Sequence, residues 1–394
     1  MSLQTHDVVV VGGGPAGATA ATDLARRGRL VLLLDRAGRI KPCGGAIPPR
    51  LIDEFAIPES LLVARIASAR MLSPSDRRVD MPINGGFVGM VDREHFDEWL
   101  RARAASVGAT RATGTYRSMR RLDDGLTVVT YRDEAGQEHA AGARVVIGAD
   151  GARSAVARDA VACADQGSFV FAYHEIIRAP QAPGADYKAS RCDVIYRGEL
   201  SPDFYSWVFP HGDTVSIGTG TAHKGFSMRD AVAQLRREMG LERQETLRRE
   251  GAPIPLRPLR RWDNGRDVVL AGDAAGVVAP ASGEGIYYAM AGGRMAAAAV
   301  EEFLATGNAR ALGNARRQFM RAHGRVFMVL GIMQRFWYAS DARRERFVSI
   351  CRDKDVQDLT WQAYMHKKLV RTRPLAHLRI FAKDVAHLLG LARV

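Results

Sequence analysis

Residues 6–36 read HDVVVVGGGPAGATAATDLARRGRLVLLLDR and contain a complete nucleotide-binding unit in one span. Val8 to Val11 form a buried-strand run, Ala16 to Arg26 carry small helix-forming residues, and Leu30 to Leu34 form a second apolar run. The glycines between them fit the pattern G-x-G-x-x-G. Its first glycine turns the chain, its second lets a pyrophosphate approach the backbone, and its third lets the helix pack on the strand. The stretch therefore predicts a βαβ unit that binds a dinucleotide.

Residues at this turn and at the end of the second run are the expected cofactor contacts. Asp35 follows the second run at the spacing where an acidic side chain accepts hydrogen bonds from ribose hydroxyls. Glycine turns are common, but this one follows a strand and opens a helix, which favours a nucleotide over an ordinary βαβ turn. The contacts predicted from this unit are Gly12, Gly14, Ala16, Gly17, Asp35 and Arg36.

The chain of 394 residues has room for two domains, and its composition is that of an ordinary globular protein. Its cysteines are scattered and form no C-x-x-C pair, so we expect no disulfide framework, no metal site and a reducing, cytoplasmic setting. They are Cys43, Cys163, Cys192 and Cys351. No signal-like segment opens the chain, and the apolar run from Val326 to Met333 is far shorter than the ~20 residues that a membrane span needs.

The positive charge is concentrated in the C-terminal part of the chain. Residues 307–394 hold 18 Lys and Arg against 6 Asp and Glu, a net charge of +12 out of +13 for the whole chain. Helices that mix bulky apolar and basic residues usually cap a core and less often lie on a membrane. No nucleic-acid-binding module is recognisable, so we expect an anionic membrane surface or an acidic partner, and no nucleic acid.

Two further segments could contact the cofactor. The loop RIKPCGGAIPP (39–49) has two glycines beside a cysteine, which permit close approach to a flat ring, although an ordinary turn is the alternative. Residues 90–105 predict an amphipathic helix with Asp92 as N-cap, and Arg93 in its first turn could reach a phosphate or a ring edge, or remain a solvated charge. The contacts predicted here are Cys43, Gly44, Gly45, Ala46 and Arg93.

Two later turns complete the nucleotide-binding pattern. RVVIGADGARSAVAR (144–158) places Asp150 and Gly151 after a short buried strand, and it resembles the Asp-Gly fingerprint of the flavin hydroxylase superfamily, which implies a position near the pyrophosphate. RDVVLAGDAAGVVAPASGEGIYYAMA (266–291) places another turn between a strand and a helix, and its first Gly-Asp resembles the aspartate motif that bonds the ribityl chain there. Three such turns in this order call for FAD. The contacts predicted from the third are Gly272, Asp273, Pro280, Gly283 and Gly285.

A stripe of aromatic residues marks a second sheet. Phe169 to Gly220 are rich in aromatic and β-branched residues, which predicts mostly antiparallel strands. Within this span, PDFYSWVFP (202–210) alternates aromatic residues, so on a strand their side chains face one side. Such a stripe is usually a sheet core, and the functional alternative is the wall of a long apolar pocket. The substrate contacts predicted from it are Tyr205, Trp207, Phe209 and Pro210.

Together these motifs resemble the geranylgeranyl reductase family. PDFYSWVFP fits the family pattern P-x-x-Y-x-W-x-F-P, and KPCGGAIP (41–48) resembles the flavin-adjacent loop of the branch that serves chlorophyll and bacteriochlorophyll synthesis. The resemblance extends by motif to about Ala305, and Asp35 stands where a Glu is common. It implies an FAD-dependent reductase that converts a geranylgeranyl group, as the diphosphate or a pigment ester, to phytyl by reducing three double bonds.

The implied reaction needs a proton as well as a hydride, because an isolated alkene has no carbonyl to accept electrons. Aromatic faces can stabilise the tertiary cation that protonation leaves, which makes Tyr205 and Trp207 candidates for catalysis. Cys43, Glu284 or a bound water could donate the proton. No second G-x-G-x-x-G unit is present, so either NADPH, the expected donor, binds transiently at the flavin domain or a protein donates the electrons.

The expected fold is α/β (α+β). A Rossmann-like FAD-binding domain (1–65, 88–165 and 263–305) is interleaved with an antiparallel β-sheet domain for the substrate (66–87 and 166–262), and a basic helical region (306–394) follows. This region could hold the enzyme on the cytoplasmic face of a photosynthetic membrane. Three alternatives remain: a flavin monooxygenase of an aromatic or polyprenyl substrate, a flavin-carrying assembly protein of pigment membranes, and a reductase of archaeal-type lipid chains.

Overall fold

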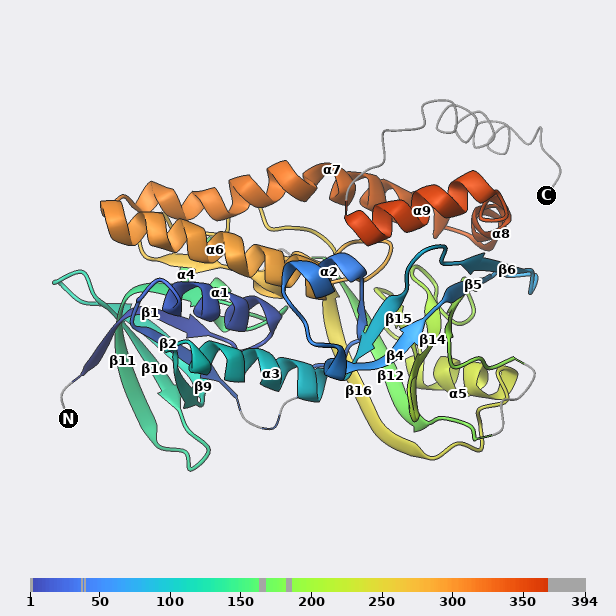
Figure 1. Ribbon diagram of the computed structural model, residues 1–394, viewed down its shortest axis with the longest axis horizontal. Coiled ribbons are helices and arrows are strands. Elements are labelled where there is room, and N and C mark those ends of the chain that lie inside the picture. The colour runs from blue at the N-terminus through green and yellow to red at the C-terminus, as the bar shows by residue number, and fades with distance from the viewer. Residues whose placement is uncertain (1–2, 37, 39, 163–167, 182–185, 368–394) are drawn as a thin grey trace. The chain divides into compact units, whose positions relative to one another are not determined.

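The computed structural model of the protein describes residues 3–36, 38, 40–162, 168–181 and 186–367, and it combines helices with three β-sheets (Figure 1). The chain divides into two compact units. The first comprises residues 1–41, 93–169 and 253–327, and the second comprises residues 42–92, 170–252 and 328–394. Cys163 and the end of the basic region, residues 368–394, lie outside the described residues.

A seven-stranded sheet carries the nucleotide motifs in the first unit. Its strands are β1 (Gln4–Val11), β2 (Val31–Asp35), β8 (Thr110–Thr113), β9 (Thr115–Arg121), β10 (Thr127–Arg132), β11 (Glu138–Gly148) and β17 (Val268–Leu270). The order is β8-β2-β1-β11-β10-β9, and β17 pairs with β11. β1 lies parallel to β2 and β11, and β11 lies parallel to β17. These central strands are buried, which is why their sequences are nearly continuous apolar runs.

Helices of the first unit pack on this sheet and on one another. They are α1 (Pro15–Ala25), α3 (Arg93–Ser106), α4 (Ala155–Ala160) and α6 (Ile286–Thr306), with the 3-10 turns η2 (Gly272–Ala275) and η3 (Ala309–Gly313). α1 contacts both α3 and α6. Small residues on α1 and α6 allow close packing of the two helices, since a Cβ added at Gly293 would lie 2.2 Å from the Ala16 carbonyl oxygen.

Two further sheets form the second unit. The small one contains β3 (Ala46–Ile47), β7 (Val88–Val91) and β4 (Leu62–Ile66), in that order. The large one contains β5 (Ser68–Leu72), β6 (Arg78–Pro82), β12 (Phe169–Arg178), β13 (Arg191–Ile195), β14 (Ser206–His211), β15 (Thr214–Thr221) and β16 (Thr246–Pro255). Its order is β16-β12-β15-β14-β13-β5-β6. It contains the predicted antiparallel pairs, but β13 lies parallel to β5.

The remaining helices lie mainly in the second unit. They are α2 (Pro49–Glu54), α5 (Met228–Glu238), α7 (Asn314–Trp337), α8 (Asp341–Ile350) and α9 (Lys354–His366), with the 3-10 turn η1 (Glu59–Leu61). α5 buries Val232 and Leu235 against Val208 and Ile217 of the large sheet. Its polar face carries charged residues, so the helix has the amphipathic pattern of a core cover.

The unit boundaries differ from the expected domain ranges, most extensively between residues 42 and 92. Residues 42–65 and 88–92 lie in the second unit, although the sequence suggested that they belong with the nucleotide-binding domain. The reason is that β3 and β4 both pair with β7, which binds this segment into one small sheet. The boundary also falls within α7, after Phe327. Along the described ranges, no helix combines the length and the apolar character that crossing a membrane would require.

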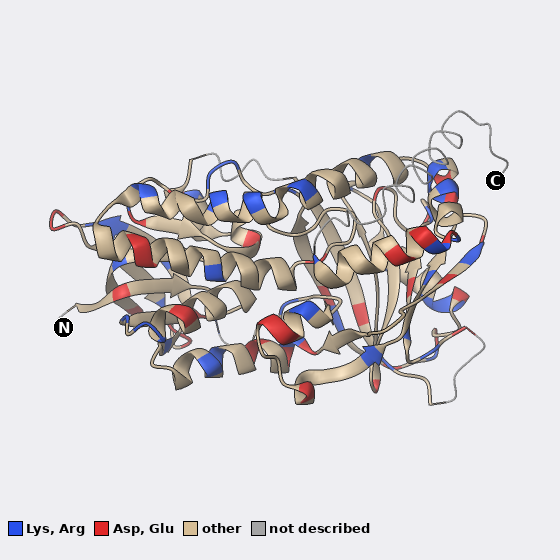
Figure 2. Ribbon diagram, turned by 45° about the horizontal axis from the view of Figure 1, so that its top comes forward, with Lys and Arg blue, Asp and Glu red and all other residues tan. Residues whose placement is uncertain are grey.

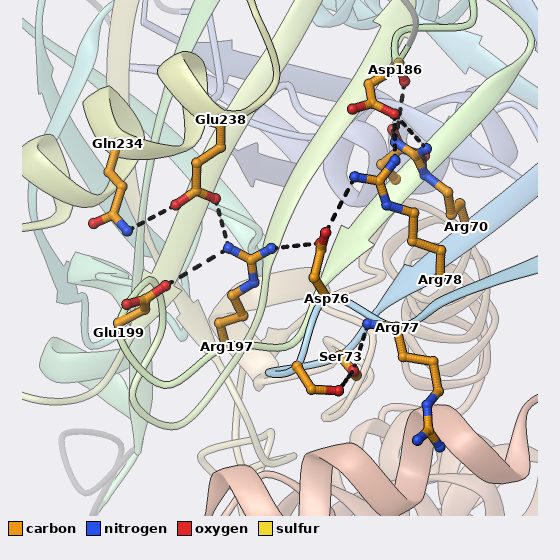
Figure 3. Close-up of polar contacts among 12 residues, drawn as sticks. Arg70, Ser73, Asp76, Arg77, Arg78, Asp186, Arg197, Glu199, Gln234 and Glu238 are labelled. Atoms are coloured by element: carbon orange, nitrogen blue, oxygen red, sulfur yellow. Dashed lines mark hydrogen bonds and ion pairs between the residues drawn. The ribbon is translucent and has the colours of Figure 1, made fainter.

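A network of ion pairs ties several strands and α5 of the second unit together (Figure 3). Its buried part is centred on Asp193, whose carboxylate binds Arg70 at 2.8 Å and Arg191 at 2.8 Å. Its half-buried part includes Arg197, which binds Glu238 at 2.8 Å. Because a buried carboxylate is costly without partners, the two guanidinium groups account for the presence of Asp193 on β13, beside β5.

Candidate functional site

The three nucleotide turns come together at the carboxyl ends of β1, β11 and β17. Val11 pairs with Gly148, and Gly148 pairs in turn with Leu270. Immediately after these last paired residues, the Ala149 amide donates to the Val11 carbonyl at 2.8 Å, and the Ala271 amide donates to the Gly148 carbonyl at 2.9 Å. Segments more than 120 residues apart thus end side by side, at the edge where parallel sheets bind ligands.

The glycines of the first turn have the distinct tasks that the motif assigns to them. A Cβ at Gly12 would lie 2.3 Å from the Ala149 carbonyl oxygen, and one at Gly17 would lie 1.8 Å from the Gly12 carbonyl oxygen, so both positions are needed for packing. A Cβ at Gly14 would meet nothing within 4 Å. Gly14 is also the N-cap of α1 and provides no side-chain cap. An open, uncapped helix start fits the pyrophosphate of FAD.

The third turn leads into the N-terminus of α6. A Cβ at Gly272 would lie 2.7 Å from the Ala16 Cβ, so the third turn packs directly on α1. Pro280 and Gly283 bend the chain before α6, with the Gly283 amide donating to the Pro280 carbonyl at 3.2 Å. Gly285 is the N-cap of α6, which has no side-chain cap and no acidic residue in its first turn. Such a helix start favours negative charge on a bound group.

Asp35 has a partner that sequence reasoning missed. The Arg101 guanidinium, from α3, binds the Asp35 carboxylate at 3.0 Å and donates to the Gly13 carbonyl at 3.4 Å. It therefore orients the acid that we expect to accept from ribose hydroxyls, while Arg36 is exposed beside it. Arg101 is one of several charges on an amphipathic helix, and no sequence signal separates it from the others.

Asp150 lies at the predicted turn, but its carboxylate binds its own helix. It accepts from the Ser154 hydroxyl, from the Ala155 amide at 2.7 Å and from the Val156 amide at 3.3 Å, and so it caps α4. Burial raises the pKa of Asp150 above its ordinary value, although these hydrogen bonds favour the charged form. Gly151 beside it borders open space. The expected position of this turn near the pyrophosphate therefore stays a prediction.

Two other predicted cofactor residues have charged partners. Asp273, whose side chain is 9% exposed, forms an ion pair with Lys41. The sequence placed Lys41 in the glycine loop and gave it no partner. Arg93 is buried and binds Asp97 through two hydrogen bonds of 2.8 and 2.7 Å. The expected cofactor contacts of Asp273 and Arg93 therefore stay predictions. Glu284 is half-buried in the bend before α6.

The aromatic stripe is a continuous wall in the second unit. The ring centroids of Tyr205 and Trp207 lie 6.0 Å apart, and those of Trp207 and Phe209 lie 6.2 Å apart. Trp207 and Phe209 alternate on β14, and Tyr205 immediately precedes that strand. Tyr205 also stacks on Phe204 at 4.3 Å. Pro210, next along β14, is buried. Tyr205 and Trp207 meet edge to face, and the Trp207 and Phe209 rings are tilted by 37°, so the rings form one apolar aromatic cluster.

The cysteine loop packs on the end of this wall. A Cβ at Gly44 would lie 3.1 Å from the Phe209 ring, and one at Gly45 would lie 2.6 Å from the His211 Nε2. The Gly45 amide donates to the Cys43 sulfur at 3.4 Å, and Cys43 is a half-buried free thiol. Burial lowers the pKa of the His211 imidazole, which also bonds the Phe209 carbonyl at 3.0 Å. Sequence reasoning missed His211, because nothing in its neighbourhood shows that the loop reaches it.

Comparisons with known proteins decide the family. The FAD binding domain family matches residues 58–318, and the NAD(P)-binding Rossmann-like domain family matches residues 10–54. Geranylgeranyl diphosphate reductase of Rhodobacter capsulatus is 60% identical over 387 residues, which cover 98% of both chains. This chain belongs to the geranylgeranyl reductase family. The geranylgeranyl diphosphate reductase of Synechocystis is 38% identical over 403 residues and 97% of each chain.

The fold of this geranylgeranyl reductase family member also matches solved structures. A geranylgeranyl bacteriochlorophyll reductase-like protein from Thermoplasma acidophilum aligns with a TM-score of 0.81 and 21% identity, over 95% of this chain and 100% of its own. The predicted fold class, the FAD cofactor and the oxidoreductase class are therefore confirmed. The roles of the individual site residues stay predictions.

Proposed function

We propose that this protein reduces three double bonds of a geranylgeranyl group to leave phytyl, in the synthesis of chlorophyll or bacteriochlorophyll. The 60% identity to a geranylgeranyl diphosphate reductase over nearly the full length carries this proposal. The aromatic wall supports it, because the ring faces of Tyr205 and Trp207 suit an unactivated hydrocarbon chain. The substrate is the free diphosphate or the pigment ester, two forms that present the same chain to the wall.

In alkene reduction, the aromatic wall stabilises the cation and the cysteine loop supplies the proton. A proton added to the less substituted alkene carbon leaves a tertiary cation on the substrate. The ring faces of Tyr205 and Trp207 stabilise that cation by about 0.5–2 kcal/mol each in a dry site. The Cys43 thiol donates the proton, because its loop packs on the Phe209 end of the same wall, and Glu284 or a water is the alternative donor. FAD, when bound and reduced, supplies the hydride.

NADPH is the proposed source of the electrons. The NAD(P)-binding Rossmann-like family matches residues 10–54, which is the βαβ unit that also holds the first FAD turn. The sequence has no second G-x-G-x-x-G unit, so the nicotinamide nucleotide binds transiently and leaves. A protein donor is the alternative, and it would leave the rate of flavin reduction independent of NADPH concentration.

Deletion of the gene in a pigment-forming host tests the function. Mass spectrometry of the pigments should then show geranylgeranyl tails in place of phytyl tails, and the intact gene should restore phytyl. A flavin-carrying assembly protein would leave the tails unchanged and lower only the amount of pigment complex. Unchanged tails in the deletion strain would contradict the proposed reductase.

We also propose that α7 holds the protein peripherally on the cytoplasmic face of an anionic, pigment-bearing membrane. α7 contains five arginines and no acidic residue, and Figure 2 shows basic residues along it. On the same helix Met328 is 60% exposed and Ile332 is 61% exposed, one turn apart. Apolar side chains next to basic ones suit a membrane interface.

Vesicle sedimentation tests the membrane proposal. The double variant Met328→Gln and Ile332→Gln should bind anionic vesicles less than wild type does, and added salt should weaken the binding of both. Leu247→Gln is the matched control, since Leu247 is 40% exposed on β16 of the large sheet. Equal binding by the double variant and wild type would refute a role for this face of α7.

A further inference from the structure

A chain of buried polar groups runs from the indole of Trp207 across the large sheet of the second unit. The Trp207 Nε1–H donates to the Ser216 hydroxyl at 3.1 Å, and that hydroxyl bonds the His174 Nδ1 at 2.9 Å. The His174 Nε2 in turn bonds the Glu250 carboxylate at 3.0 Å, and Arg248 lies 3.1 Å from the same carboxylate. These residues come from β14, β15, β12 and β16.

The backbone makes room for this chain at one position. Trp207 pairs with Gly218 on β15, and Gly218 pairs with His174 on β12, so the three lie in a row across the sheet. A Cβ at Gly218 would lie 2.4 Å from the Trp207 ring and 2.5 Å from the His174 Cβ. The missing side chain is what allows the indole to lie across β15 and its N–H to reach the Ser216 hydroxyl.

Every proton in the chain has a consistent place. A carboxylate accepts only, so the His174 Nε2 carries a hydrogen toward Glu250. In the neutral ring the Nδ1 is then an acceptor, and the Ser216 hydroxyl donates to it while accepting from the Trp207 Nε1–H. His174 is 3% exposed, Ser216 is fully buried and Trp207 is 6% exposed, so no solvent is needed to complete these bonds.

We propose that Glu250, His174 and Ser216 are positioning residues that fix the Trp207 indole so that it turns its ring face, and not its N–H, to the substrate. A buried N–H without a partner attracts water and costs free energy next to hydrocarbon. With its N–H bonded to Ser216, the indole offers the alkene and its cation a dry π face. This inference rests on the proposed reductase function, but the geometry it describes is measurable in the resting protein.

Ser216→Ala is the direct test, and Ser206→Ala is its matched control. Ser206 is also fully buried, on β14, and its hydroxyl bonds Thr219 at 2.9 Å without touching the Trp207 N–H. In the FAD-loaded protein, Ser216→Ala should speed hydrogen exchange of the Trp207 indole N–H, observed by NMR, by at least about tenfold. It should also lower kcat by about tenfold with FAD still bound. Ser206→Ala should change neither quantity by that much.

A double-mutant cycle separates positioning from a merely structural role. In a Trp207→Phe background no indole N–H remains, so adding Ser216→Ala should lower kcat no further. Glu250→Gln keeps an acceptor for the His174 Nε2–H and should behave like wild type. Glu250→Ala removes that acceptor and should also speed hydrogen exchange of the Trp207 indole N–H. It provides the test if Ser216→Ala folds poorly.

Unchanged indole exchange in both Ser216→Ala and Glu250→Ala would overturn the proposal, as would an equal effect of Ser206→Ala. A further loss of kcat in the Trp207→Phe background would also overturn it. If wild type instead shows slow indole exchange but no geranylgeranyl reduction, the hydrogen-bond chain stands and the proposed function is what fails.

Discussion

Replacing Gly293 with alanine should weaken FAD binding, because the new methyl group forces α6 away from the start of α1. The added Cβ would lie 2.2 Å from the Ala16 carbonyl oxygen and 3.0 Å from its carbonyl carbon. Both are backbone atoms that no side-chain rotation can move. Reaching an ordinary contact of 3.4 Å requires the two helices to separate by about 1 Å. Ala16 is two residues after the Gly14 cap, so the displacement reaches the turn that we assign to the pyrophosphate.

The size of the expected loss of FAD affinity follows from the free-energy cost of overpacking. Inserting a methyl group into a close-packed contact costs about 1–3 kcal/mol. If that cost falls on the FAD-bound state, the dissociation constant for FAD rises by about 5- to 150-fold. Gly292→Ala is the control one residue earlier on α6, since its Cβ would meet no atom closer than 3.8 Å. As a glycine in a helix interior, Gly292 should gain about 1 kcal/mol of stability on becoming alanine.

Titration of each apoprotein with FAD, followed by quenching of flavin fluorescence, measures the difference. Gly293→Ala should bind FAD more weakly than Gly292→Ala, which should bind it as wild type does. Wild-type affinity in Gly293→Ala would refute the assignment of the α1 start to the pyrophosphate. Equal weakening in both variants would show that crowding at Ala16 is not the cause.

Three further predictions concern the second unit. Asp193→Ala leaves the buried Arg191 without the Asp193 carboxylate and Arg70 with Asp186 at 3.3 Å, and it should cost about 3–5 kcal/mol in urea unfolding. Glu199→Ala, at a side chain that is 59% exposed, should cost less than about 1 kcal/mol, and similar losses in the two variants would contradict this. Burial lowers the pKa of His211 below 6.5, so on acidification the unfolded chain takes up the proton before the folded chain does. The free energy of unfolding is therefore highest above pH 6.5 and falls as the pH drops from 6.5 to the lowered pKa of folded His211. His211→Asn should flatten this loss between pH 7 and 5, and an unchanged slope would count against the assignment. Trp207→Ala should slow alkene reduction by roughly 2- to 30-fold in stopped-flow assays with FAD still bound, and equal rates would remove Trp207 from the mechanism.

The nucleotide-binding unit was predictable because its contacts are local. Within residues 6–36 the strand, the turn and the helix follow one another, so the spacing of Gly12 and Gly17 places Gly17 against the Gly12 carbonyl oxygen. The contact of Gly12 with Ala149 is not local and does not follow from this spacing. The aromatic wall was predictable for a similar reason, since alternation on a strand places Tyr205 and Trp207 on one side. In both cases the spacing of residues within a short segment predicts which side chains or backbone atoms lie together.

Contacts between distant segments could not be predicted in this way. Arg101 binds Asp35 across 66 positions, and nothing in the pattern of α3 distinguishes it from the other charges there. Residues 42–65 were expected in the nucleotide-binding domain, because they follow its first unit in sequence. They pack instead in the second unit, where Gly44 contacts Phe209, and this depends on strand pairing with β7 that no local motif encodes.

Polar partners of the predicted site residues were also hidden from the sequence. Trp207 was expected to act through its ring, but the bond from its N–H to Ser216 depends on the register of β14 against β15 and on Gly218 between them. Asp150 was expected at the pyrophosphate, and its carboxylate caps α4. A motif thus predicts where a residue lies better than it predicts which group its side chain binds.

The most direct test of the central claim is the mass of the product formed by the purified, FAD-loaded protein. The protein would be incubated without oxygen with NADPH and either geranylgeranyl diphosphate or a geranylgeranylated pigment. We expect a product heavier by two hydrogens for each of three double bonds, with the fourth retained, from at least one of these substrates. Unchanged masses for both substrates, or a product that forms only in air and carries added oxygen, would contradict it.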